Sequence, residues 1–490
     1  MQKISCPSCG GEVVFRSAAS VMAVCSYCQS TLLKDAESVK NIGKMSDLLE
    51  DYSPLQITST GSFQGRNFSL VGRIQLRYED GIWNEWHAMF DDGSAGWLSD
   101  ASGQYVFTVA ETIPAQDAPP FENIRPGLPL RFRGATLFAS DVRSAHCIAG
   151  EGELPFQVGH GWVAKAADFR VGMRFVTLDY SDGPAPQAYV GQAVTLEQMH
   201  CQLLRSADGV DKSVSRFRGQ AVALACPACG SSIKYMAGMA YHVTCPACHA
   251  EVDCSTDKAL VLQKADQLAK ITTTVSLGDV ATINGAKYET IGLMQCQTSD
   301  GSESWTWVEY LLFNPSKGFH WLVESSEGWD SVGVLNEWPD QGAMGGASLH
   351  GDTYAKTEEY DATVLYAAGA FNWRVSVGDR NHVVEYKKGN RTLTSESNPS
   401  EIVWSAGRRV DAAQIAQWFG KKSEAAAADT SVDSKHTFSS AGVFTILVIA
   451  LNLPLSLASG MAGIWVMLTA LFVLWLPVLV VGYFGKDRNV

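Results

Sequence analysis

Cys6-Pro7-Ser8-Cys9-Gly10, followed fifteen residues after Cys9 by Cys25-Ser26-Tyr27-Cys28, is the stretch that decides how this chain is built. The arrangement returns at Cys226-Pro227-Ala228-Cys229-Gly230 and Cys245-Pro246-Ala247-Cys248, so both copies read C-x2-C-x15-C-x2-C. Two Cys-x-x-Cys hairpins at this separation can present four thiolates to one Zn2+, as in a zinc ribbon. The sequence therefore predicts two structural zinc sites. The predicted ligands are Cys6, Cys9, Cys25, Cys28, Cys226, Cys229, Cys245 and Cys248.

A second interpretation treats Cys6-Pro7-Ser8-Cys9 as a thioredoxin-like redox pair. A redox motif needs only one such pair, whereas here a partner pair follows at a fixed distance in both copies. We therefore favour the metal sites. Five other residues could replace a cysteine ligand, although four cysteines already complete each site. These residues are His200, Cys201, His242, His249 and Cys254.

Length, charge and cysteine usage restrict the class of protein. A chain of 490 residues is long enough for roughly three or four domains, and a hydrophobic content of 46% is enough for buried cores. The formal net charge of −13 leaves no broad basic surface for phosphate groups, which argues against nucleic-acid binding. No hydrophobic signal segment follows Met1, so we expect a reducing cytoplasm in which the thiols bind metal.

The sequence pattern divides the chain into alternating small and large parts. The large parts consist of short runs of alternating polarity separated by glycines, as at residues 68–78, which is typical of half-buried β-strands. We predict a mainly β fold with a β-barrel or β-sandwich in each large part. Short helices are predicted over 36–52 and 258–270. The parts are zinc ribbon 1 at 1–34, β unit 1 at 55–205, zinc ribbon 2 at 222–254 and β unit 2 at 272–420.

The second ribbon and β unit copy the first. The four metal cysteines and the start of the β unit recur at a constant offset of 220 residues, and a further four residues are inserted later. A common register across ribbon and β unit indicates that the whole module was duplicated, and two copies are too few for a solenoid. The aligned pairs are Gly65–Phe68 with Gly285–Tyr288, Gly72 with Gly292, Glu85-Trp86 with Glu309-Tyr310, and Trp97-Leu98 with Trp321-Leu322.

The end of the chain has the composition of a membrane anchor. Residues 421–437 are polar and rich in alanine, as in a flexible linker. Residues 441–485 contain no Asp, Glu, Lys or Arg, and polar or helix-breaking residues interrupt the middle. We predict two transmembrane helices within 440–484, in preference to a buried core hairpin, because each half is long enough to span a bilayer. Lysine and arginine flank both ends but not the turn, so both ends should face the cytoplasm.

Each β unit resembles a bacterial family called domain of unknown function 4178. Its motif, G-x-x-Y/F-x-x-x-G followed by W-x-E-aromatic and W-L, stands in unit 1 at Gly65–Gly72, Trp83–Trp86 and Trp97-Leu98. The resemblance implies a β-rich fold, a bacterial inner-membrane protein and gene neighbours that include polyamine-synthase-like and small membrane proteins. It implies no activity, so no catalytic residue is carried over. The proline-rich segment 114–129 of unit 1 has no clear counterpart in unit 2.

Glu85 and Glu309, each beside aromatic residues at a repeated position, are the candidate acid/base or ligand-binding groups. Neither has a second carboxylate or a histidine beside it in the sequence, so a structural role is favoured over a ligand contact. The sequence has no nucleophile elbow and no phosphate-binding loop. Tryptophans are more often core or interface residues than base-stacking platforms. The tryptophans considered are Trp83, Trp86, Trp305, Trp307 and Trp321.

Three functional hypotheses follow. The first is a membrane-anchored, zinc-binding cytoplasmic scaffold or recognition protein with partners at the inner membrane, because the cysteine sites are closed and the β units are duplicated. The second is a small-molecule sensor or enzyme with a pocket in a β unit, linked through the family resemblance to polyamine-type metabolism. The third, nucleic-acid binding through the ribbons, is disfavoured because neither ribbon has a basic stripe.

Overall fold

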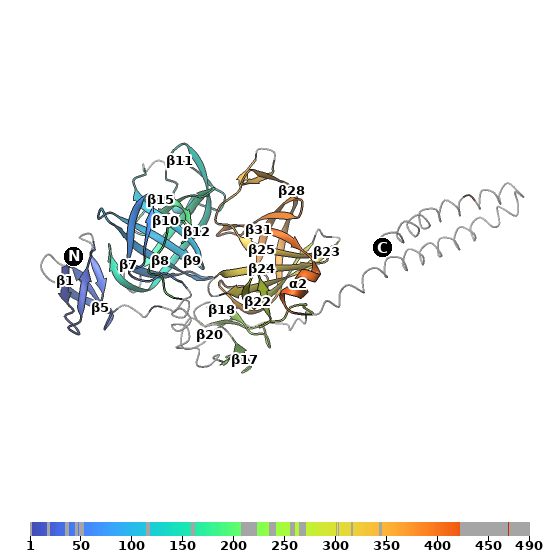
Figure 1. Cartoon of the computed structure of the whole chain (residues 1–490), viewed down its shortest axis with the longest axis horizontal. Coiled ribbons are helices and arrows are strands. Elements are labelled where there is room, and N and C mark those ends of the chain that lie inside the picture. The colour runs from blue at the N-terminus through green and yellow to red at the C-terminus, as the bar shows by residue number, and fades with distance from the viewer. Residues whose placement is uncertain are drawn as a thin grey trace, which may run out of the picture. The chain divides into compact units, whose positions relative to one another are not determined.

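The computed structural model describes residues 2–16, 20–34, 39–44, 48, 53–113, 118–157, 162–206, 223–234, 242–254, 260–263, 271–299, 301, 303–314, 317–342, 345–421 and 469. These residues form mainly β-strands (Figure 1). The chain divides into two compact units, Met1–Val410 and Asp411–Val490. All strands of the described residues belong to the first unit.

Eight antiparallel strands close the first barrel in the order β7-β8-β9-β10-β15-β14-β13-β12, and β12 returns to pair with β7. Their bounds are β7 (Arg66–Arg77), β8 (Ile82–Phe90), β9 (Ala95–Ala101), β10 (Gln104–Glu111), β12 (Ala135–Leu154), β13 (Val163–Val171), β14 (Arg174–Asp179) and β15 (Gln187–Val194). The flanking elements are β6 (Thr60–Phe63), the 3-10 turn η2 (Phe121–Asn123) and β11 (Pro129–Phe132). Of the two predicted architectures, β unit 1 therefore adopts the barrel.

The second barrel repeats this topology with eight strands in the order β22-β23-β24-β25-β31-β30-β29-β28, and β28 pairs with β22. Their bounds are β22 (Ala286–Ser299), β23 (Ser304–Asn314), β24 (Gly318–Ser325), β25 (Gly328–Val334), β28 (Asp352–Phe371), β29 (Arg380–Lys388), β30 (Arg391–Ser397) and β31 (Ile402–Val410). The flanking strands are β21 (Val280–Ile283), β26 (Asp340–Gln341) and β27 (Ala347–Leu349). The matching strand order confirms the predicted tandem repeat.

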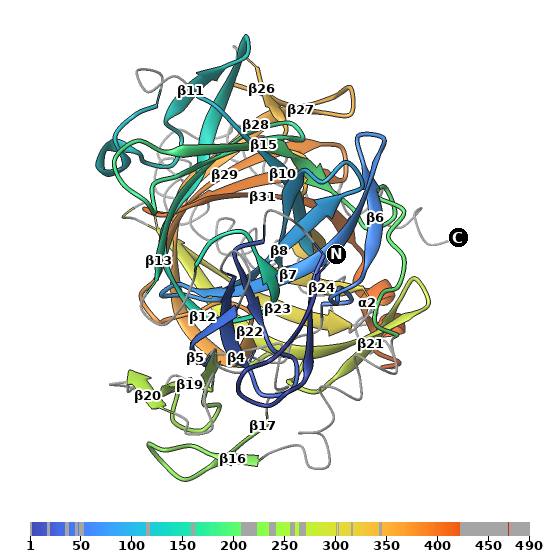
Figure 2. The same ribbon diagram turned by 90° about the vertical axis from the view of Figure 1, so that its left-hand side faces the viewer.

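Each ribbon joins the sheet of its own barrel. Its first hairpin is a separate two-stranded sheet, whereas the strands after it extend the barrel, through β3 pairing with β12 and β18 pairing with β28 (Figure 2). Ribbon 1 contains β1 (Gln2–Ser5), β2 (Glu12–Phe15), β3 (Met22–Val24), β4 (Ser30–Lys34) and β5 (Val39–Lys44). Ribbon 2 contains β16 (Ala223–Ala225), β17 (Ser232–Lys234), β18 (His242–Thr244), β19 (Glu251–Asp253) and β20 (Leu260–Gln263).

The two predicted connector helices are wrong where the structure describes these segments. Residues 39–44 form strand β5 on the edge of β4, and residues 260–263 form β20 on the edge of β19. Both segments contain β-branched residues, and the edge strand of each ribbon offers unpaired backbone groups. Backbone pairing therefore outweighs a weak helical pattern at both positions.

The two faces of the barrel strands differ in character. On β8, Trp86 is fully buried in a hydrophobic cluster with Phe107, Leu55 and other residues, some from outside the barrel strands. Glu85 is on the opposite face. It senses the charge of Asp168 on β13, and β13 is not a neighbour of β8 in the sheet. Only the inside of a closed barrel brings these strands together, so Glu85 points into the barrel.

Contacts between the two barrels occur within the first compact unit. The guanidinium of Arg143 on β12 bonds Asp141, reaches the Glu401 carboxylate beside β31, and stacks 3.9 Å from the centre of the Tyr78 ring. The Val142 backbone N–H donates to the Ser400 carbonyl at 2.9 Å. Because the Arg143 side chain is only 13% exposed, this is a largely buried ionic contact.

The second compact unit contributes one described helix, α2 (Ala412–Trp418). Among the described residues no helix is both long and apolar enough to cross a membrane. The predicted linker 421–437 is described only at Lys421, and of the predicted transmembrane segment 440–484 only Thr469 is described. Those two predictions thus fall almost entirely outside the described residues.

Candidate functional site

The eight predicted ligands form two separate groups of four thiols. Within each group all sulfur atoms lie within 4.8 Å of one another. The Sγ–Sγ distance is 3.7 Å for Cys6–Cys28 and for Cys9–Cys25, and 3.7 and 3.8 Å for the corresponding pairs of ribbon 2. A tetrahedron of Zn–S bonds of about 2.3 Å has edges of about 3.8 Å. Each group therefore has the donor set and spacing of a four-thiolate zinc site.

Local backbone turns hold the thiols in this arrangement. In each Cys-x-x-Cys pair the residue after the second cysteine donates its N–H to the carbonyl of the first cysteine, at 2.8 Å in all four pairs. That residue has a positive φ, which glycine adopts without strain. The four residues are Gly10 (φ 75°), Gln29 (φ 58°), Gly230 (φ 76°) and His249 (φ 54°). The glycine that follows the first pair of each ribbon thus has a conformational reason.

One thiol in each group carries a serine two residues further along the chain. The Ser30 hydroxyl lies 3.2 Å from Cys28 Sγ, and hydrogen bonds from the Ser30 side chain and backbone lower the pKa of Cys28 to about 6. Ser231 acts in the same way on Cys229 and lowers its pKa to about 6. A thiolate is the form that binds metal, so both sites have a donor prepared for zinc.

The alternative ligands lie near the groups but are not part of them. The His249 ring contacts Tyr366, and its Nδ1 lies 3.4 Å from the Ala367 carbonyl oxygen. Burial raises the pKa of Cys254 to about 12 and that of Cys201 to about 11, which disfavours the thiolate at either position. Bound zinc would contribute folding free energy here and hold the two hairpins of each ribbon together.

The repeated W-x-E motif forms the same hydrogen bond in both barrels. Trp83 Nε1 donates to Glu85 Oε1 at 2.8 Å, and Trp307 Nε1 donates to Glu309 Oε1 at 2.7 Å. The two residues are separated by one position on a β-strand, so their side chains lie on the same face. The Ser99 hydroxyl also donates to Glu85. Both partners of each pair therefore face the barrel interior.

Carboxylates from three strands gather inside the first barrel. Desolvation raises the pKa of Glu85 to about 7, and the charges of Asp168 and Asp179 raise it further. Burial also raises the pKa of Asp168 to about 6, although the Thr177 hydroxyl donates to it at 2.7 Å. A carboxyl with a pKa of about 7 is partly protonated at neutral pH, so it can donate or accept a proton there.

The second barrel contains a comparable group built from other positions. Burial raises the pKa of Glu309, and burial together with the charge of Glu309 raises the pKa of Glu396 on β30 to about 8. Tyr360 donates to Glu385 Oε1 at 2.8 Å and stacks edge-on against Trp307. Two carboxyls in one desolvated interior cannot both ionise easily, because each disfavours the charge of the other.

The sequence found one member of each interior group and missed the rest. Asp168, Asp179, Glu385 and Glu396 have no equivalent at the same offset in the other unit, so the repeat does not single them out. Among the tryptophans, Trp86 and Trp321 are core residues as expected, whereas Trp305 is 45% exposed.

A separate pocket of about 360 Å³ lies beside the first barrel. It is bordered by three glutamines, two methionines, a serine, a phenylalanine and a valine. Neither Glu85 nor Glu309 lines it, so the interior carboxylates and this pocket are different features of the molecule. The lining residues are Ser62, Phe63, Gln64, Met173, Gln192, Val194, Gln198 and Met199.

Tandem eight-stranded barrels, each extended by a tetracysteine ribbon, define the class of protein. Residues 56–196 and 276–412 match the family model described as a domain of unknown function (DUF4178). These matches cover more than half of the chain, which therefore belongs to this family and carries its domain twice. No curated protein and no solved structure matches the chain.

Proposed function

We propose that this chain is a zinc-stabilised recognition protein, not an enzyme, which its C-terminal segment holds at the bacterial inner membrane. The observation that carries the proposal is the pair of four-thiol groups, each joined to its barrel through a shared sheet. Four protein thiolates fill a tetrahedral zinc ion and leave no position for substrate, which is the mark of a structural site. Zinc then supports the barrels as binding modules.

Duplication gives the proposed recognition protein two similar modules on one chain. When two modules are linked and attached to one membrane, binding of the first to a partner raises the effective concentration of the second. Such an arrangement suits a scaffold that collects protein partners at the membrane surface. The formal net charge of −13 favours partners with basic surfaces over nucleic acids.

Affinity purification from detergent-solubilised native membranes tests this proposal. We compare the full chain with a variant that ends at residue 434, and identify bound proteins and small molecules by mass spectrometry. The full chain should require detergent for extraction and retain a reproducible protein partner, whereas the shortened chain should be extracted without detergent. A full chain that is released from membranes by buffer alone refutes the anchor, and the lack of any specific protein partner refutes the scaffold.

The Trp–Glu pairs favour a second candidate function, binding of a small organic cation inside each barrel. Each pair places a desolvated carboxyl next to an indole, and amines interact favourably with both groups. A polyamine is one compound of this class. Calorimetric titration with spermidine should give binding that strengthens above pH 7, as Glu85 ionises, and that the double variant Glu85→Gln, Glu309→Gln abolishes. Equal heats for spermidine and for a neutral diol of similar length would contradict it.

A further inference from the structure

The strand that closes each barrel is also the strand that receives the ribbon. One edge of β12 pairs with β7 over Cys147–Gly152, and the other edge pairs with β3 over Gly152–Leu154. Gly152 therefore has partners on both sides, Gly72 in the barrel and Val24 in the ribbon. We call the β7–β12 ladder the seam of the first barrel, because it is the pairing that closes the cylinder.

The second module repeats this junction residue for residue. Gly369 of β28 pairs with Gly292 of β22 on one edge and with Thr244 of ribbon strand β18 on the other. We call the β22–β28 ladder the seam of the second barrel. A ribbon strand placed at the end of the seam in both copies indicates that the junction is part of the module.

Close approach of the backbones makes this junction sensitive to movement. Gly152 and Gly369 have φ of 70° and 94°, and a Cβ atom on either would lie 2.2 Å from the Val71 carbonyl oxygen or 2.3 Å from that of Ile291. No side chain fits between the seam strands at this position. The seam therefore depends at its end on backbone pairing, to which the ribbon strand contributes from the other side.

In the first module a buried carboxylate links ribbon and seam. Glu153 is 1% exposed and follows Gly152 directly. Its carboxylate accepts hydrogen bonds from the Arg16 backbone N–H at 2.7 Å and from the Ser20 hydroxyl at 2.9 Å, and both donors belong to the ribbon. The Glu153 carbonyl oxygen lies 3.0 Å from His87 Nδ1 on β8. If the ribbon unfolds, this carboxylate loses donors that offset its burial.

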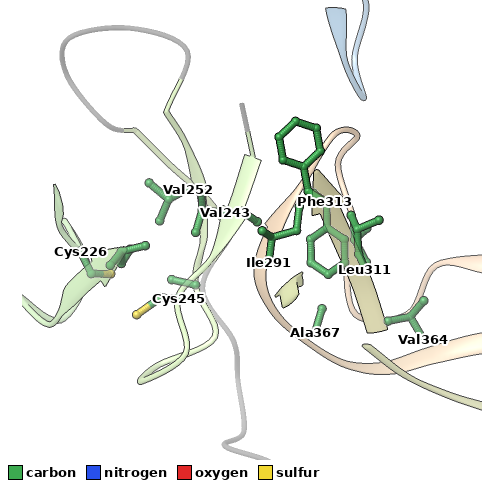
Figure 3. Packing of buried hydrophobic residues seen from close by; sticks show 14 of the residues in the cluster. Cys226, Val243, Cys245, Val252, Ile291, Leu311, Phe313, Val364 and Ala367 are labelled. Atoms are coloured by element: carbon green, nitrogen blue, oxygen red, sulfur yellow. The ribbon is translucent and has the colours of Figure 1, made fainter. Parts of the chain in front are cut away.

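In the second module hydrophobic packing makes the link. Cys226, Val243 and Cys245 of the ribbon share one buried cluster with Ile291 and Phe313 of the barrel (Figure 3). Two of these five residues are predicted zinc ligands. Loss of the metal would therefore disturb side chains that also pack against the seam strand β22.

We propose that zinc binding in each ribbon controls whether the seam of the adjoining barrel is closed. With zinc bound, β3 and β18 stay on the outer edges of β12 and β28, and the barrel interiors that contain Glu85 and Glu309 are closed. Without zinc the ribbon strands leave, the seams open at their glycine ends and the interiors become accessible. This inference rests on the proposed zinc sites and adds a metal-dependent change to them.

Hydrogen–deuterium exchange of the full protein in detergent, before and after treatment with a zinc chelator, tests the inference. Zinc removal should accelerate exchange in peptides covering Leu70–Leu76 and Cys147–Leu154 by about tenfold or more, while β10 keeps its protection. The second seam should respond in the same way. A zinc content close to zero in the untreated protein would refute the metal sites themselves. Two zinc ions whose removal leaves both seams protected would refute only the inference.

A pair of variants separates the ribbon linkage from general unfolding. Glu153→Gln keeps all eight cysteines, so zinc content should stay at two ions while exchange accelerates in the first seam alone. Glu12→Gln is the matched control, because Glu12 is an exposed ribbon carboxylate whose side chain pairs with Lys3 at 2.9 Å. It should leave both seams unchanged. Equal exchange of the first seam in the two variants would contradict the linkage through Glu153.

Discussion

At the residue scale, the Trp–Glu pair is the clearest product of the duplication. Trp83–Glu85 and Trp307–Glu309 keep one hydrogen bond at nearly the same length, although the residues around them differ. Glu85 pairs across the strands with Ser99, whereas Glu309 pairs with Val323. A buried carboxyl without a cation beside it is costly unless it is protonated or hydrogen-bonded, and the indole N–H supplies one such bond.

Glu85→Gln should remove part of the pH dependence of stability. Because burial raises the pKa of Glu85 from 4.5 to about 7, the folded state binds this proton more tightly than the unfolded state. The stability that protonation provides is complete below about pH 4.5 and falls as the pH rises to about 7. Glutamine resembles the protonated acid, so the variant should match the wild type at pH 5 and exceed it by about 1–3 kcal/mol at pH 8.

Urea denaturation at the two pH values, monitored by tryptophan fluorescence, measures this difference. Glu12→Gln serves again as the exposed control and should follow the wild type at both pH values. A Glu85→Gln protein that loses stability between pH 5 and pH 8 as steeply as the wild type would show that this carboxyl is not the group that titrates.

Cys226→Ser combined with Cys229→Ser should reduce the bound zinc from two ions per chain to one. Two thiolates of ribbon 2 are lost, and the remaining two cannot complete a tetrahedral site. Because Cys226 packs with Ile291 in the shared cluster, the second barrel should also lose stability. Zinc is measured by mass spectrometry of the purified protein. Cys254→Ser, outside the four-thiol group, should retain two ions, and an unchanged zinc content in the double variant would refute the assigned site.

At the scale of elements, the fold depends on short turns with left-handed residues and on seams with glycine. The hairpin into β12 turns at Arg133 and Gly134 with positive φ, and the hairpin into β28 turns at His350 and Gly351 with nearly the same angles. The segment after the proline-rich 114–129 region therefore does have a structural counterpart in the second unit. The sequence comparison missed it because turn conformation is shared while residue identity is not.

Gly152→Ala should destabilise the first barrel more strongly than Gly134→Ala. Both glycines have positive φ, so each alanine carries a left-handed strain of about 1–2 kcal/mol. Only Gly152 adds a Cβ at 2.2 Å from the Val71 carbonyl oxygen, whereas a Cβ on Gly134 meets nothing within 4 Å. The difference between the two variants in the free energy of unfolding isolates the clash. Equal destabilisation would mean that the seam can separate without loss.

Sequence patterns predicted the local parts of this architecture and missed the distant ones. The cysteine spacing, the alternation of polarity and the repeat identified the ribbons and the strand-rich modules, since these depend on neighbours along the chain. Strands β5 and β20 were mistaken for helices because their pairing partners decide their conformation. Barrel closure and the meeting of Glu85 with Asp168 depend on contacts between residues far apart in the chain, which local patterns do not encode.

At the scale of the whole molecule, a few buried polar groups join the barrels. Arg143 of the first barrel bonds Asp141 and reaches Glu401 of the second, and the Trp338 backbone N–H donates to the Gly172 carbonyl at 3.0 Å. An arginine shared by two largely buried carboxylates is costly to remove, because the carboxylates are left without a cation. The pairing makes unfolding of one barrel depend on the presence of the other.

Arg143→Met should uncouple the two barrels during unfolding. The methionine fills a similar volume above Tyr78 but leaves Asp141 and Glu401 facing each other, at a cost of about 3–5 kcal/mol unless one takes up a proton. Scanning calorimetry should then show two separated transitions where the wild type shows overlapping ones. Arg66→Met is the control, because Arg66 and its partner Asp92 are exposed and their pairing should contribute less than about 1 kcal/mol. If the Arg143 variant keeps the wild-type profile, the barrels unfold independently of this contact, and the coupling must come from the backbone bonds at Ser400 and Gly172.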